Sequence, residues 1–285
     1  MLKRVHFKNT LLASVLILPQ LLITFIFFLW PAFQALKQAF LLSDPFGGGV
    51  QFVWFDNFIS LFSDKEYFES FKITVIFSLG TAFLSLTFGL FFAVLANRLR
   101  KNKNLVQSIL IWPYAVAPAI AGVLWMFMFH PSFGVISFGL QGIGFEWNPV
   151  LHSRQALIMV IVAASWKQIS YNFVFFLGGL QSIPRSVLEA AAIDGANPFQ
   201  RFWKIVFPLL SPTAFFLLVM NLVFAFFETF GIIHAVTQGG PGGATNILVY
   251  KVFADGFVGL NLGASAAQSV ILMVVTILLT CLLYT

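Results

Sequence analysis

Long apolar stretches recur along the whole chain, and they restrict its fold more than any other feature. Each is about twenty residues or longer, the length that an α-helix needs to cross the hydrocarbon core of a bilayer. The six stretches cover residues 11–40, 71–96, 106–129, 156–180, 209–233 and 264–285. They do not alternate apolar and polar residues as the strands of a membrane β-barrel do. We therefore predict an all-α, polytopic membrane protein with six transmembrane helices.

The basic residues gather between these stretches on one side of the predicted membrane. If every stretch crosses, ten of the sixteen Lys and Arg residues share that side: Lys3, Arg4, Lys8, Arg98, Arg100, Lys101, Lys103, Arg185, Arg201 and Lys204. The opposite side carries mainly acidic residues: Asp44, Asp56, Asp64, Glu66, Glu69, Glu146 and Asp255. The positive-inside rule then places the N-terminus in the cytoplasm. This distribution explains the net charge of +6 by contact with membrane lipid, and we expect no nucleic-acid partner.

The two ends of the sequence allow two further expectations. The N-terminus begins like a signal peptide, but its apolar part is too long and no small-residue cleavage site follows, so we predict a retained first span. The sixth stretch reaches residue 285 without a closing basic residue. We expect the natural chain to continue, with an unusually short cytoplasmic tail as the alternative. We predict a single membrane domain over residues 1–285, with a core from about residue 70. Cys281 is the only cysteine, which excludes an intramolecular disulfide and a cysteine metal cluster.

A charged stretch, EAAAIDGANPFQRFWKIVFPLL, lies between the fourth and fifth apolar stretches at residues 189–210. The residues before Gly195 favour a helix, with Pro184 suited to its first turn. Gly195 can end that helix with a positive φ, and Asn197-Pro198 favours a turn into a second helix. We predict a helix, a pivot and another helix on the cytoplasmic face. An ordinary amphipathic loop at the lipid interface is the simplest alternative.

The order of residues in this stretch resembles the EAA motif of the membrane permeases of bacterial ATP-binding-cassette importers. The matching residues are Glu189, Ala190, Ala191, Gly195, Ile205 and Pro208, with Phe207 where leucine is usual. The resemblance implies the type I importer permease (MetI-like) fold and a coupling loop, residues 183–208, that fits a groove on a separate ATPase. It also implies that Glu189 and Asp194 position the joint, while Ala190, Ala191 and Gly195 permit close docking. The chain has no phosphate-binding Gly-x-x-x-x-Gly-Lys-Ser/Thr loop, so we expect ATP and Mg to bind the partner and no cofactor to bind here.

Longer segments carry the resemblance further. DPFGGGVQFVWFDNFISLF, PYAVAPAIAGVLWMFMFHPSFG, SWKQISYNFVFFLGGLQSIPRS and QGGPGGATNILVYKVFADGF are similar to sequences of sn-glycerol-3-phosphate permeases. WKQISYNF and QSIPRS also occur, in milder form, in permeases for maltose and other sugars. The resemblance therefore implies import of sn-glycerol-3-phosphate or glycerophosphodiesters, with a sugar or oligosaccharide as the alternative. It implies as partners a second, similar permease subunit, two ATPase subunits and an extracytoplasmic substrate-binding protein.

A few polar residues lie inside the predicted spans. A charge at the bilayer centre costs about 3 kcal/mol or more, so such a residue normally faces the protein interior or a cavity. Helical spacing places four of the residues on one face, and a further pair lies in the fifth stretch. The candidates for a translocation path are Lys167, Gln168, Tyr171, Asn172, Asn221 and Glu228. One alternative is that these polar groups bond across helices. Another is that Lys167 and Glu228 reach the membrane interface, or form a pair that locks two helices. The second is favoured for Glu228 because a carboxylate would repel a phosphate.

Two more segments invite a functional interpretation. Pro113 and Pro118 are expected to kink the third span and to free backbone carbonyls, which suits a moving gate but also occurs in static helices. TQGGPGGATN, residues 237–246, is expected to be an outer loop with unusual backbone geometry. The resemblance places this loop near the binding protein, and a plain turn is equally compatible with its sequence.

Three other classes of protein are alternatives to a permease. An ion-coupled secondary transporter typically shows internal repeats and has no reason to carry the EAA pattern. A membrane-embedded enzyme is disfavoured because the spans lack paired acidic residues, an HExxH motif and a serine–histidine arrangement. A purely structural membrane subunit is not excluded by the sequence. We predict a non-catalytic transport subunit.

Overall fold

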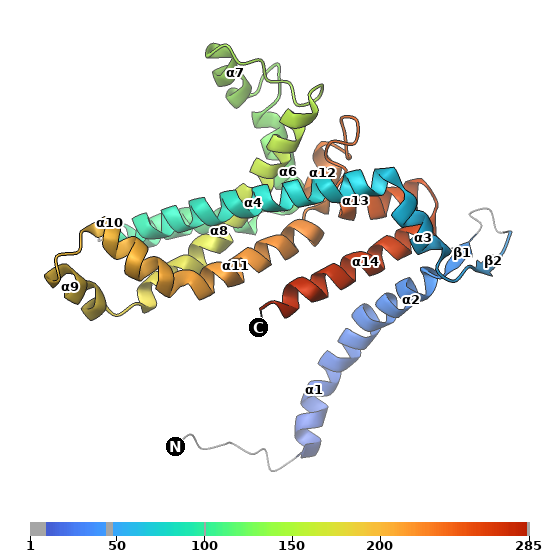
Figure 1. Cartoon of the computed structure of the whole chain (residues 1–285), viewed down its shortest axis with the longest axis horizontal. Helices are drawn as coiled ribbons and strands as arrows, with labels where there is room; N and C mark the ends of the chain where they lie inside the picture. The colour runs from blue at the N-terminus through green and yellow to red at the C-terminus, as the bar shows by residue number, and fades with distance from the viewer. Residues whose placement is uncertain (1–9, 44–47, 100, 284–285) are drawn as a thin grey trace. The chain divides into compact units, whose positions relative to one another are not determined.

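The computed structural model describes residues 10–43, 48–99 and 101–283, and most of these residues are helical (Figure 1). Among them, five helices are long and apolar enough to cross a membrane, and one sharply bent pair of helices makes a sixth candidate span. The predicted all-α, multi-pass architecture is confirmed. Contacts divide the chain into two compact units, residues 1–63 with 255–271 and residues 64–254 with 272–285.

The first unit begins with a long helix formed by α1 (Thr10–Thr24), the π-helical segment η1 (Phe25–Leu29) and α2 (Trp30–Gln38). Strands β1 (Leu41–Ser43) and β2 (Val50–Phe52) then pair antiparallel, and α3 (Asp56–Ser63) follows. The unit also holds most of η4 (Ala254–Val258) and the first half of α14 (Leu262–Cys281).

A small core holds this unit together. Ala39, Ala266 and Ala267 are buried against Phe58. The side-chain amide of Asn57 donates to the carbonyls of Ala39 and Leu41, at 2.9 and 3.1 Å. Small residues therefore let the start of α14 approach the chain that follows α2.

The second unit is built on α4 (Lys65–Arg98), α8 (Ser153–Ser182) and α11 (Phe207–Phe227), which pack against one another (Figure 1). Helices α4 and α8 run in the same direction, since Gly80 lies against Ile161 and Gly89, further along α4, lies against Asn172. A Cβ atom on Gly89 would come within 2.6 Å of the Cβ atom of Asn172, so this glycine sets the close approach of the two helices. Helix α11 runs in the opposite direction.

Because α4 and α8 are parallel, the chain between them must return across the membrane once. The segment that returns consists of α5 (Lys103–Ile111), the 3-10 turn η2 (Trp112–Ala115) and α6 (Pro118–Met128), with a bend of 102° between its arms. Pro113 and Pro118 lie at this bend, as the sequence predicts. The expected kink is a full break, because two prolines five residues apart remove two backbone N–H donors.

The fifth span differs from its predicted bounds of 209–233. Helix α10 (Pro198–Arg201), the π-helical segment η3 (Phe202–Val206) and α11 form one apolar helix over Pro198–Phe227. Pro208 does not interrupt it: the carbonyl with which this proline would clash belongs to Lys204, inside η3, where a wider turn accommodates the ring. Residues up to 233 belong to a separate short helix, α12 (Phe230–Val236). The remaining helices are α7 (Val135–Gly142), α9 (Arg185–Ile193) and α13 (Leu248–Phe253).

Candidate functional site

The charged stretch forms two helices that meet at Gly195. This residue has a φ of +81°, and its N–H donates to the carbonyl of Ala192 at 3.1 Å. The N–H of Ala196 donates to the carbonyl of Ala191 at 3.0 Å, which completes a Schellman motif at the end of α9. A Cβ atom on Gly195 would meet nothing within 4 Å, so the backbone conformation alone demands glycine. The predicted helix end at Gly195 is confirmed.

The second helix begins two residues later, at a capping box. Asn197 Oδ1 accepts from the N–H of Gln200 at 2.8 Å, and Gln200 Oε1 accepts from the N–H of Asn197 at 3.1 Å. Pro198 occupies the first helical position, where its missing N–H has no consequence. Only Ala196 separates the two helix ends, so local hydrogen bonds fix most of the joint.

The surface of this joint is largely exposed at the end of the unit where α4 and α8 terminate (Figure 1). Glu189, Ala190, Asp194 and Gly195 are exposed, whereas Ala191 is buried. Ile193 is 86% exposed beside them. Of the motif's last two residues, Ile205 is half-buried and Pro208 is exposed. Exposed apolar and charged side chains on a rigid helix pair are suited to contact with another protein.

Lys167 extends from α8 to the break in the third span. Its Nζ donates to the carbonyl of Tyr114 at 2.7 Å and to that of Val116 at 3.0 Å, and its side chain is buried. In a continuous helix the Tyr114 carbonyl would accept from residue 118, which is a proline and has no N–H. Lys167 therefore supplies the donor that Pro118 cannot.

Aromatic contacts hold both arms of the break against α8. Trp166 packs edge-on against Trp112 before the break and Trp125 after it, with ring centroids 6.4 and 6.1 Å apart. Tyr171, which is half-buried, stacks on Tyr114 at 5.8 Å. Part of the polar face predicted on α8 therefore binds and stabilises the broken third span.

The remaining candidate path residues are distributed differently. Asn172 and Asn221 are both fully buried and exchange side-chain hydrogen bonds at 3.0 and 2.8 Å, joining α8 to α11. These two residues therefore form a cross-helix contact, which the sequence left open as an alternative to a translocation path. Gln168 is buried on α8, and Glu228 is exposed at the C-terminal end of α11. The structure therefore brings Asn172 and Asn221 together and places Glu228 at the surface.

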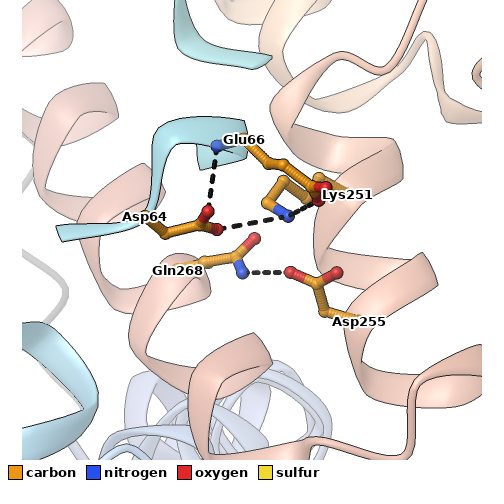
Figure 2. Close-up of polar contacts among 5 residues, drawn as sticks. All are labelled: Asp64, Glu66, Lys251, Asp255 and Gln268. Carbon is orange, nitrogen blue, oxygen red and sulfur yellow. Dashed lines mark hydrogen bonds and ion pairs between the residues drawn. The ribbon is translucent and has the colours of Figure 1, made fainter. Parts of the chain in front are cut away.

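An ion-pair cluster that the sequence did not reveal lies at the opposite end of α4 (Figure 2). Lys251 Nζ lies 3.6 Å from Asp64 Oδ2 and 3.8 Å from Glu66 Oε2, and the lysine is buried. Asp64 also caps α4 by accepting from the N–H of Glu66 at 2.9 Å. A second contact joins the same elements, since Thr74 Oγ1 accepts from the N–H of Leu248 at 2.8 Å. The only signal for this cluster was a single lysine in an apolar run on the acidic side.

The first unit has a polar contact of its own between η4 and α14. Gln268 Nε2 donates to Asp255 Oδ2 at 2.6 Å (Figure 2). Ser265, on the same helix, packs so closely on Gly256 that a Cβ atom there would lie 2.6 Å from its Oγ. The sequence indicated Asp255 only as one of the outer acidic residues.

The glycine-rich loop at residues 237–246 has the unusual backbone that its sequence predicts. Gly239, Gly242 and Gly243 have positive φ values, and the Gly240–Pro241 bond is cis. The hydroxyl of Thr245 donates to the Gly240 carbonyl at 2.8 Å and also forms a hydrogen bond with the hydroxyl of Thr237 at 2.7 Å. These contacts give the loop a defined shape.

Comparison with known proteins agrees with this architecture. Residues 85–285 match the family described as binding-protein-dependent transport system inner membrane component. The chain is 56% identical over 279 residues to the sn-glycerol-3-phosphate transport system permease protein UgpA of Rhizobium meliloti (strain 1021), which covers 98% of this chain and 95% of that protein. It is 53% identical over 277 residues to the protein of the same name from Yersinia pestis, covering 97% of this chain and 94% of that protein.

Solved structures show the same fold. A chain of a bacterial ABC transporter involved in the import of the acidic polysaccharide alginate superposes with a TM-score of 0.82 at 22% identity, covering 96% of this chain and 93% of that one. A chain of the MetNI methionine ABC transporter superposes with a TM-score of 0.52 at 18% identity, covering 73% and 88%. The predicted MetI-like fold is confirmed.

Proposed function

The chain belongs to the family of binding-protein-dependent transport system inner membrane components, and we propose that it carries sn-glycerol-3-phosphate or glycerophosphodiesters into a bacterial cell. The observation that carries this proposal is the identity of 53–56% to permeases of that name over at least 97% of the chain. The chain is the membrane component of an importer, and ATP hydrolysis is assigned to a partner subunit.

The joint between α9 and α10 supports a proposal for how that partner acts. We assign it to the cytoplasmic side because the basic C-terminal end of α4 and the charged loop lie at one end of the second unit. The basic residues Lys3, Arg4 and Lys8 assign the N-terminus to the cytoplasm by the same rule. The Schellman motif and the capping box restrict movement between α9 and α10. A displacement of α9 by the ATPase is therefore transmitted to α11 and is not lost as local disorder. The proposed complex contains two ATPase subunits, a second similar permease subunit and an extracytoplasmic substrate-binding protein.

Lys167 supports the proposed substrate class. A phosphate ester carries nearly two negative charges, and its passage through a low-dielectric region requires a cation or many hydrogen-bond donors. An ammonium group has three donors, and the carbonyls of Tyr114 and Val116 take two of them. We assign the third donor and the charge of Lys167 to the translocation path, with Gln168 and Tyr171 beside it on α8. Glu228 is exposed at the C-terminal end of α11, and its carboxylate still interacts electrostatically with Lys167.

Uptake into proteoliposomes tests the substrate assignment. The complete transporter, reconstituted with ATP inside and binding protein outside, is expected to take up radiolabelled sn-glycerol-3-phosphate. Excess unlabelled glycerophosphodiester should reduce this uptake, and excess maltose should not. Uptake of labelled maltose in place of the phosphate ester would replace the proposed substrate with a sugar and leave the permease assignment intact.

A further inference from the structure

An apolar groove lies on the second unit beside the coupling joint. It has a volume of ≈880 Å³ and is bounded by α4, α8, α10, η3 and α11. Its walls are largely aromatic and aliphatic, including Leu90, Phe91, Phe199, Trp203 and Phe207. Thr87 and Arg98 are the polar residues among those that line it.

The groove continues at one end into a smaller, basic pocket of ≈250 Å³. The two hollows share Val94, Arg98, Pro198 and Phe202. Asn97 and Arg201 also line the smaller pocket, and none of the residues that line either hollow is acidic. Arg201 Nε is buried and has no hydrogen-bond partner among the described residues. The apolar groove thus leads to the guanidinium groups of Arg98 and Arg201. The buried Nε–H of Arg201 is free to donate a hydrogen bond to a ligand.

We propose that this composite site binds one anionic phospholipid, with an acyl chain in the groove and the phosphate at Arg98 and Arg201. Guanidinium groups bind phosphate oxygens through paired, charge-assisted hydrogen bonds. Arg98 ends α4, and Trp203 lines the same groove; tryptophan and basic residues are both typical at headgroup depth. An apolar helix of another subunit would fill the groove but would leave the two cations without a counter-charge.

The position of the site links lipid to the coupling joint. Pro198, Arg201 and Phe202 belong to the helix that follows Gly195, whereas Val94, Asn97 and Arg98 belong to α4. A lipid that contacts both sets of residues bridges the joint to the bundle. The lipid composition of the membrane would then alter how firmly the second coupling helix is held.

Native mass spectrometry of the full chain tests the proposal. The chain is released from nanodiscs that contain equal amounts of phosphatidylglycerol and phosphatidylcholine, and retained lipids are counted. The wild type is expected to keep one phosphatidylglycerol. The double variant Arg98→Gln/Arg201→Gln should lose about tenfold or more of that retention, as expected for the loss of charge-assisted hydrogen bonds. Ala214→Trp, which fills the groove without changing charge, should lower it as well.

A matched control removes the same charge elsewhere on that end of the protein. Lys101→Gln/Lys204→Gln changes two exposed lysines that line neither hollow, and retention should stay at the wild-type level. Equal retention in all variants, or equal retention of both lipids, would overturn the proposal. Weaker co-purification of a second permease subunit with Ala214→Trp, without any change in lipid retention, would assign the groove to a helix instead.

Discussion

Two helix breaks in this permease are stabilised in different ways. At Gly195 the hydrogen bonds that end α9 and begin α10 join residues within 190–201, and the joint is largely exposed. At residues 116–117, inside a candidate span, the freed carbonyls of Tyr114 and Val116 are bound by Lys167 on another helix. The first break is local and the second depends on a tertiary contact.

The difference follows from the solvent around each break. A helix end in water can leave backbone groups to the solvent, so a short capping sequence is sufficient. A break at membrane depth has no water to satisfy its carbonyls, and protein must supply the donor. The coupling joint should therefore tolerate changes elsewhere in the protein, whereas the break in the third span should depend on α8.

The largest expected effect is on the break in the third span. Lys167→Met removes the donor of two carbonyls, which should lower the free energy of unfolding by about 2–4 kcal/mol. Steric trapping in bicelles measures this quantity for a membrane protein. Lys167→Arg restores donors and charge, and it should recover more stability and more sn-glycerol-3-phosphate uptake than Lys167→Gln.

Lys72→Met is the matched control, because it also removes a lysine from a long helix. The side chain of Lys72 on α4 is mostly exposed, and its Nζ lies 4.0 Å from Glu69 Oε2. Its effect should stay within about 0.5 kcal/mol. Similar losses for Lys72→Met and Lys167→Met would show that the contacts of Lys167 do not stabilise the break.

A smaller and strictly local effect is expected at the coupling joint. Gly195→Ala places a Cβ atom on a residue with a φ of +81°, which costs about 1–2 kcal/mol. Amides near the end of α9 should then exchange hydrogen faster, while those of α6 and α8 should be unchanged. Hydrogen-exchange mass spectrometry resolves the two regions.

Gly178→Ala provides the comparison within α8. A Cβ atom there also meets nothing within 4 Å, but Gly178 lies in the interior of a helix. Alanine is the better helix former, so this change should be neutral or slightly stabilising. Slowed or unchanged exchange in Gly195→Ala would mean that the left-handed backbone does not set the end of α9.

The same contrast explains what could be predicted from sequence. Gly195 and Asn197 were predictable because their partners lie within five residues along the chain. Lys167 was visible as a charge inside an apolar stretch, but its partner Tyr114 is 53 residues away. The Asn172–Asn221 pair spans 49 residues, and composition alone did not distinguish a path from a cross-helix contact.

Helix bounds were predicted less well where proline was involved. Pro208 was expected to precede the fifth span, whereas the π-helical turn at Phe202–Val206 carries one helix through it. The break at Pro113 and Pro118 was predicted in place but not in size, because the bend of 102° depends on how α8 holds both arms. The position of a proline in the sequence predicts where a helix is disturbed. Packing against neighbouring helices decides how large the bend is.

The ratio of sn-glycerol-3-phosphate imported to ATP hydrolysed tests most directly the claim that the joint at Gly195 transmits the motion of the ATPase. In proteoliposomes with the complete transporter, Gly195→Leu should lower this ratio about fivefold or more, as expected for a lost coupling of at least 1 kcal/mol. Gly178→Leu should leave the ratio unchanged. A normal ratio in Gly195→Leu, with the ATPase retained at the wild-type level, would contradict the account.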